Sequence, residues 1–177
     1  MPSEHTPTIT LRYNGLFDYD GLYAAIIDWC KNYGFMWHEV DYKHKVPSPA
    51  GAEQELVWQL TKRVTDYIHF KITFVVHIWD LLEVKVDTGG KQRTLSNARI
   101  DMVMKGTLEY DWQKRMKGSK FADWLGRTYR NLVFKKELEG GYVDQLYYRM
   151  WNLHALIKKY FDMQTKKYAY KGYLGED

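Results

Sequence analysis

The sequence contains a single cysteine, Cys30, among its 177 residues. One cysteine cannot form an internal disulfide, so a hydrophobic core must hold the fold, and we expect Cys30 to lie on a helix as a small buried hydrophobe. No apolar run approaches the roughly 20 residues that cross a bilayer. The segment from Met1 to Pro7 lacks the basic and apolar regions of a signal peptide. We therefore expect a soluble cytoplasmic protein.

Motifs that would identify a reaction are also missing. The sequence has no Gly-x-Ser-x-Gly elbow, no Walker pattern and no dinucleotide fingerprint, because Gly89-Gly90 and Gly140-Gly141 stand alone. His38 and His44 share one face of an expected strand but would lie about 20 Å apart, too far to bind one ion. We therefore predict no metal or cofactor. An enzyme of the cyclase or hydrolase type ranks third, after the two binding functions that are described below.

Two long alternating segments are the most informative feature that is present. Between Tyr67 and Trp79, apolar residues from Ile68 to Ile78 occupy one parity and polar residues the other, with Val75 as the exception. Residues 98–112 repeat the pattern. A period of two over such a length predicts strands that are buried on one side, and two of them indicate a large antiparallel sheet.

Shorter segments complete the expected sheet. Strands are predicted at 8–13, 35–46, 53–64, 82–86 and 91–95, with turns at Asn14-Gly15 and Ser96-Asn97 and a bulge or corner at Asp80. Strict alternation within 35–46 places Glu39 on the wet face of the sheet.

One helix is expected after the first strand, and two more are expected after the last strand. Asp18 is a suitable N-cap for a helix that ends at Gly34. Ser119 is suited to begin another, and a long helix follows Gly140-Gly141 with Leu146, Met150, Leu153, Ile157 and Phe161 on one face. We therefore predict one α+β domain over residues 1–163 and a polar, flexible tail over 164–177.

This order of strand, helix, strands and helices resembles the helix-grip group, which includes the START and polyketide-cyclase-like proteins. The resemblance implies a single curved antiparallel sheet of six or seven strands that packs on a long C-terminal helix and leaves a cavity between them. The group places two helices after the first strand and one at the end, and here the count is reversed. The segments Tyr42 to Pro47 and Val64 to Tyr67 are also similar to uncharacterised archaeal proteins, which implies no function.

The resemblance leads to the main functional hypothesis, a non-enzymatic module that binds a small apolar or amphipathic ligand between the sheet and the C-terminal helix. Adaptable side chains with inward parity, or beside the helix stripe, would line the pocket. These are Trp58, Met102, Met104, Tyr110, Met150, Trp151 and His154. Ordinary core packing is the alternative for each of them.

Charge provides a hypothesis of another class. The net charge of +4 divides into −3 over residues 1–112 and +7 over residues 113–177. Lys114, Arg115, Lys117 and Lys120 lie next to the N-terminus of the helix expected from Ser119, where a phosphate group would be favoured. The alternative function is therefore docking of an anionic partner, such as nucleic acid, a membrane surface or an acidic protein, with an exposed basic face as the simpler explanation.

Overall fold

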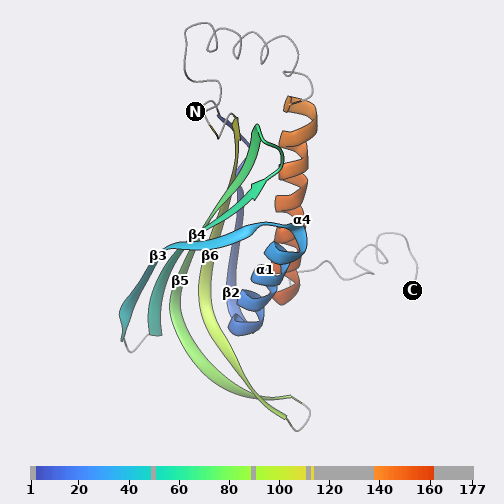
Figure 1. The fold of residues 1–177 in the computed structure, drawn as a ribbon. Coiled ribbons are helices and arrows are strands. Elements are labelled where there is room, and N and C mark those ends of the chain that lie inside the picture. Colours follow the sequence, from blue (N-terminus) through green and yellow to red (C-terminus); the bar gives the residue numbers. More distant parts are fainter. Residues whose placement is uncertain (1–2, 49–50, 89–90, 111–112, 114–137, 162–177) are drawn as a thin grey trace, which may run out of the picture.

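The computed structural model of the chain describes residues 3–48, 51–88, 91–110, 113 and 138–161 (Figure 1). These residues form an α+β fold with one antiparallel sheet of six strands. The strands are β1 (Ser3–His5), β2 (Ile9–Phe17), β3 (Met36–Ser48), β4 (Gly51–Arg63), β5 (Ile68–Thr88) and β6 (Lys91–Tyr110). The helices are α1 (Tyr19–Tyr33) and α4 (Asp144–Tyr160), the latter preceded by the π-helical turn η2 (Leu138–Val143).

The strands that come first and last along the chain are neighbours in the sheet. β1 and β2 both pair with β6, and β5, β4 and β3 follow in antiparallel sequence. The curved sheet has α1 and α4 on the same side of it, as Figure 1 shows. We call this side the concave face and the other side the outer face.

The alternation of the two long strands is confirmed. Even-numbered residues from Ile68 to Ile78 on β5 and from Ile100 to Tyr110 on β6 are buried. Their odd-numbered neighbours are intermediate or exposed, because they project from the outer face. Burial of this face over residues 68–78 and 100–110 contributes much of the core.

Two predicted turns are wrong. Asn14 and Gly15 lie inside β2, and Ser96 and Asn97 lie inside β6. β2 and β6 pair without interruption from Ile9 opposite Met104 to Phe17 opposite Ser96, so ladder hydrogen bonds override the local preference for a turn. The expected irregularity at Asp80 is confirmed, since the β5–β6 register shifts there and Asp80 has a φ of 57°.

Both ends of α1 match the prediction. The Asp18 side chain accepts a hydrogen bond from the Gly21 amide, and Gly34 adopts the left-handed conformation at the C-terminus. Lys62 of β4 adds a cap that the sequence does not reveal, because its ammonium donates to the Tyr33 carbonyl at 2.7 Å. A cation at this end also complements the helix dipole.

The C-terminal helix α4 uses the expected apolar stripe. Leu146, Met150, Leu153, Ile157 and Phe161 are all buried. Met150 packs on β6 at Gly106, and the ring of Phe161 stacks on Tyr13 of β2 with centroids 4.5 Å apart. The helix predicted from Ser119 and the tail over 164–177 lie outside the described residues. No helix in the described ranges is long and apolar enough to cross a membrane.

Candidate functional site

The structure divides the seven predicted pocket residues among three places. Trp58 and Met102 line a void between α1 and the sheet. Met104, Tyr110 and Met150 are buried in the core. Trp151 is 43% exposed, and its ring lies edge-on to that of the half-buried His154 on α4. The seven side chains therefore do not form one pocket, and only the first two border the void.

The void beneath α1 is apolar and small. Its volume is about 10 Å³, which is about the space that one water molecule needs. The aromatic residues of its lining are Tyr19, Tyr23 and Trp58, and the aliphatic and sulfur-containing ones are Leu22, Ile26, Leu56, Val76, Ile78, Ile100 and Met102. Such a lining suits the apolar body of a ligand.

A β-bulge in β3 brings a carboxylate to the edge of this region. Glu39 pairs with Trp58, but the next paired residue, Asp41, lies opposite Val57, so Val40 is an extra residue. A bulge reverses the parity of the strand that follows it. Glu39 lies opposite Trp58, whose side chain is buried on the concave face, so Glu39 lies on the concave face too. This corrects the prediction that Glu39 faces water on the outer face. His38 and His44, expected on one face, lie on opposite faces for the same reason.

Glu39 sits among aromatic side chains. Its Oε2 accepts a hydrogen bond from Trp58 Nε1 at 3.0 Å. The ring of Tyr23 meets the rings of Trp37 and Trp58 nearly at right angles, with centroids 5.9 and 5.2 Å apart. Burial, assisted by neighbouring groups that include Glu39, raises the pKa of Tyr19 to about 12. Burial and the Glu39 charge also raise the pKa of Tyr23. This corner of the concave face therefore favours neutral phenols and carries negative charge.

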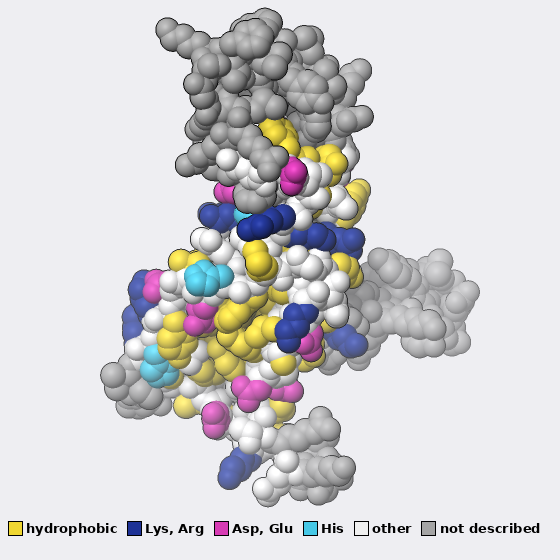
Figure 2. Space-filling view, in the orientation of Figure 1, with side chains coloured by type: hydrophobic (Ala, Val, Ile, Leu, Met, Phe, Trp, Pro, Cys, Tyr) yellow, Lys and Arg dark blue, Asp and Glu magenta, His cyan; other side chains and the backbone are white. Residues whose placement is uncertain are grey.

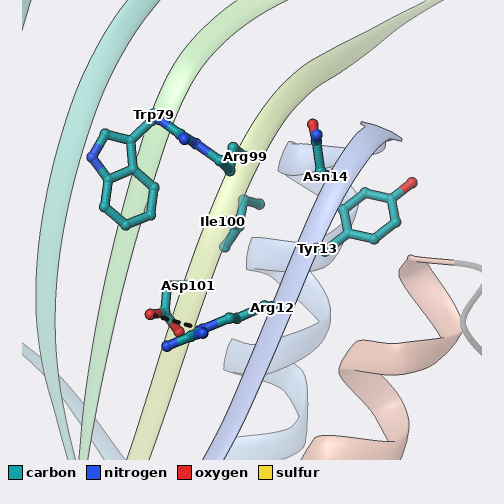
Figure 3. Close-up of a pocket in the computed structure, with 7 residues that line it drawn as sticks. All are labelled: Arg12, Tyr13, Asn14, Trp79, Arg99, Ile100 and Asp101. Carbon is teal, nitrogen blue, oxygen red and sulfur yellow. Dashed lines mark ion pairs between the residues drawn. The ribbon is translucent and has the colours of Figure 1, made fainter.

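The outer face carries a shallow groove of about 680 Å³ (Figure 3). Arg12 forms an ion pair with Asp101 at 3.4 Å, and Arg99 forms one with Asp80 at the same distance. The Arg99 guanidinium also lies 5.1 Å from the centre of the Trp79 ring. Both arginines of the groove therefore already have acidic partners, and the groove has no net charge to attract an ion.

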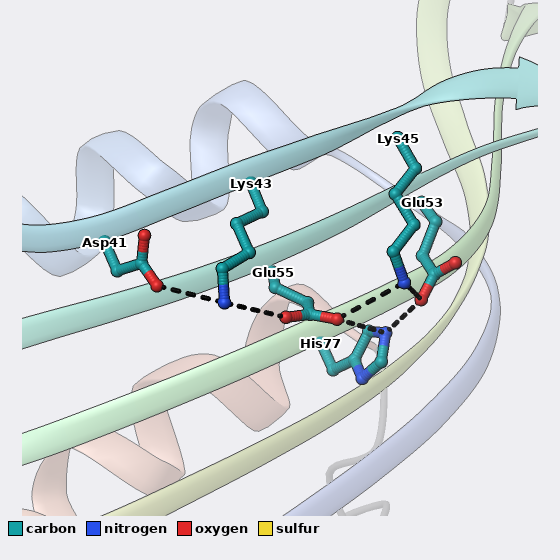
Figure 4. A network of polar contacts seen from close by, with 6 residues as sticks. All are labelled: Asp41, Lys43, Lys45, Glu53, Glu55 and His77. Atoms are coloured by element: carbon teal, nitrogen blue, oxygen red, sulfur yellow. Dashed lines mark hydrogen bonds and ion pairs between the residues drawn. The ribbon is translucent and has the colours of Figure 1, made fainter.

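A network of alternating charges crosses the outer face beside this groove (Figure 4). Possible ligand atoms of Glu53, Glu55 and His77 lie within 4.8 Å of one another, a cross-strand set that the sequence analysis missed. However, the Lys45 ammonium lies 2.8 Å from Glu53 Oε1 and 3.4 Å from Glu55 Oε1. Glu53 Oε1 is also hydrogen-bonded to His77 Nε2 at 2.7 Å. The hydrogen bonds with Lys45 and His77 lower the pKa of Glu53. The lysine thus supplies the positive charge that a metal ion would provide.

The described residues on the face seen in Figure 2 do not form a continuous positively charged surface. Figure 2 shows apolar side chains gathered in the middle of this face, with acidic, basic and histidine side chains mixed around them. The valines at 57, 75 and 103 form a cross-strand row on the outer face of β4, β5 and β6. The described part of the sheet therefore lacks the uniform positive charge of a surface that binds nucleic acid.

Other titratable groups do not indicate catalysis. Burial raises the pKa of the Cys30 thiol to about 12, so this residue is a core side chain rather than a nucleophile, as expected. Burial, assisted by the charge of Lys158, lowers the pKa of His154. Lys114, Arg115, Lys117 and Lys120, predicted to bind an anion, lie outside the described residues.

Glu39 is the residue of this candidate site that the sequence prediction placed on the wrong face. A bulge has no strong sequence signal here beyond the apolar residues Trp37 and Val40, which flank Glu39 and have opposite parity. Comparisons with known proteins supply no further guide, since no family model and no curated protein matches this sequence.

Proposed function

We propose that this protein is a non-enzymatic binding module that holds a small amphipathic ligand against the concave face of the sheet. The observation that carries the proposal is the apolar void beneath α1, which is lined by Trp58, together with the Glu39 carboxylate that accepts a hydrogen bond from the Trp58 indole. The ligand body would be held by hydrophobic burial, and a few polar contacts at the border would orient it.

The proposed site lies under α1 rather than under α4. Beneath α4, Met150 already packs on Gly106, and its sulfur accepts a hydrogen bond from Thr6 Oγ1 at 3.3 Å. Beneath α1, a void is already present, and the adaptable side chains of Met102 and Trp58 line it. A void of about 10 Å³ admits no ligand as it stands, so α1 must move away from the sheet on binding.

Polar groups at the border suit an amphipathic ligand. Trp37 Nε1 is a buried donor that has no hydrogen-bond partner among the described residues. An oxygen atom of the ligand would relieve the cost of this unpaired donor. Two residues further along β3, on the same face, the Glu39 carboxylate can accept hydrogen bonds.

The strand order also supports the helix-grip resemblance as a proposal. The first strand lies beside the last, the remaining strands follow as a meander, and a long C-terminal helix crosses the concave side. In this arrangement, the space between sheet and helices is the natural position for a ligand.

The test is native mass spectrometry of the protein purified without denaturation, followed by organic extraction of any bound molecule. Val76 lines the void and Val75 projects from the outer face, so Val76→Ile and Val75→Ile form a matched pair. We expect the wild type and Val75→Ile to retain a small ligand, and Val76→Ile to retain less because its added methyl group fills the void. Equal masses for the isolated and the extracted protein would contradict the proposal.

A further inference from the structure

Apart from Glu39, the acidic side chains of β3 and β4 lie on the outer face and have basic partners. Asp41 pairs with Lys43 at 3.2 Å, Glu55 with Lys43 at 3.6 Å, and Glu53 with Lys45 at 2.8 Å. Figure 4 shows these side chains on the side of the sheet opposite the helices. Their charges are therefore balanced within the protein.

Glu39 is the exception among these acids of β3 and β4. Its Oε2 accepts a hydrogen bond from the neutral Trp58 indole, and no lysine, arginine or histidine of the described residues forms an ion pair with it. Burying part of a carboxylate without an opposite charge is costly. One donor offsets only part of that cost, so the site has capacity for a cation.

The surroundings of Glu39 select the kind of cation. Trp37 and Trp58 have ring centroids 6.1 Å apart, and Tyr23 contacts both. Aromatic rings attract organic ammonium groups through their electron-rich faces. Mg²⁺ and Ca²⁺ instead require several oxygen ligands, which one carboxylate does not supply.

We propose that the head group of the ligand is an organic cation, a primary or quaternary ammonium, which pairs with Glu39 beside the rings of Tyr23, Trp37 and Trp58. The inference rests on the proposed function, because the attached apolar body enters the void beneath α1. Burial is the main cause of the raised pKa values of Tyr19 and Tyr23, and the Glu39 charge adds to both. The protein thus distinguishes ligands by charge as well as by hydrophobicity.

The experiment compares three probes with the same tail by isothermal titration calorimetry: hexyltrimethylammonium, 1-hexanol and hexanoate. We expect the cation to bind the wild type at least about tenfold more tightly than the alcohol, a difference within the range of combined ion-pair and cation–π interactions. Hexanoate should bind least. Glu39→Gln should remove the preference for the cation, while Glu55→Gln, on the outer face, should preserve it.

The outcomes separate the two proposals. If none of the probes binds, the proposed function fails. If 1-hexanol binds as tightly as the cation, or if Glu39→Gln retains the full preference, the binding module stands and the cationic head group is overturned. The comparison of probes on the wild type requires no variant, so it remains decisive even if Glu39→Gln is unstable.

Discussion

At the scale of single residues, Gly106 is the point where the sheet and α4 approach most tightly. A Cβ atom built there would lie 2.6 Å from both Met150 Sδ and Thr6 Oγ1. The Gly106 amide also donates to Thr6 Oγ1 at 3.2 Å, and Thr6 in turn donates its amide proton to the Gly106 carbonyl at 3.0 Å. A side chain at this position would push apart β6, α4 and the connection between β1 and β2, which these contacts hold together.

Gly106→Ala should therefore lower the free energy of unfolding by about 1–3 kcal/mol, the usual cost of overpacking a core. Gly141→Ala is the control, because a Cβ atom at Gly141 meets nothing within 4 Å. Urea denaturation of both variants measures the difference. Equal stability of the two variants would show that the close approach at Gly106 does not exist.

Residue-level predictions from the sequence succeeded where alternation is uninterrupted. The buried faces of β5 and β6, the Asp18 cap and the burial of Cys30 follow from local pattern alone. The position of Glu39 does not, because the bulge at Val40 depends on how β3 pairs with β4. One inserted residue changes the face of a charged side chain, and with it the character of the candidate site.

At the scale of elements, α4 is expected to form part of a solid core rather than the wall of an open pocket. Met150→Ala should lower the free energy of unfolding by about 2–5 kcal/mol, because it would leave a cavity against Gly106. Tyr148→Ala, at a position that is 71% exposed, should change it by less than about 0.5 kcal/mol. Thermal or urea unfolding tests both variants. A small effect of Met150→Ala would favour the pocket under α4 that the sequence first suggested.

Elements were predictable in type and order more than in number or length, because the strands predicted at 67–79 and 82–86 form the single strand β5, those at 91–95 and 98–112 form β6, and β1 was not predicted. Both described α-helices and the long strands match their hydrophobic periods. The predicted turns at Asn14-Gly15 and Ser96-Asn97 failed because β2 and β6 pair through both positions. Turn propensity is a local preference of a few residues, whereas the ladder and the buried face between two strands act over their whole length.

At the scale of the whole molecule, the outer face should respond to pH through its charge network. The pKa of Glu53 is lowered from its ordinary 4.5, chiefly by the hydrogen bond from Lys45. A lowered carboxyl pKa stabilises the fold above pH 4.5, and this contribution is lost as the pH falls through the folded-state value. Glu53→Gln should therefore be less stable than the wild type at pH 7, with a difference that shrinks at pH 3. A difference that is the same at both pH values in urea titrations would contradict this assignment.

Anion binding by the C-terminal part of the chain remains a separate prediction. The charge of +7 over residues 113–177 predicts binding to an anionic polymer such as heparin that weakens steeply as salt is raised. Replacement of Lys114, Arg115 and Lys117 by Glu should abolish this binding. If the triple variant binds heparin as the wild type does, the anionic partner is excluded at these residues.

The central claim is that a ligand enters between α1 and the sheet, and methyl-labelled NMR with 1-hexanol and hexyltrimethylammonium tests it most directly. Methyl groups report on three surfaces of the protein. They belong to the void (Ile26, Leu56, Val76, Ile78 and Ile100), to α4 (Leu146, Leu153 and Ile157) and to the outer face (Val57, Val75 and Val103). We predict saturable shifts in the first group at ligand concentrations that leave the other two unchanged. Shifts confined to α4 or to the outer face would contradict the account.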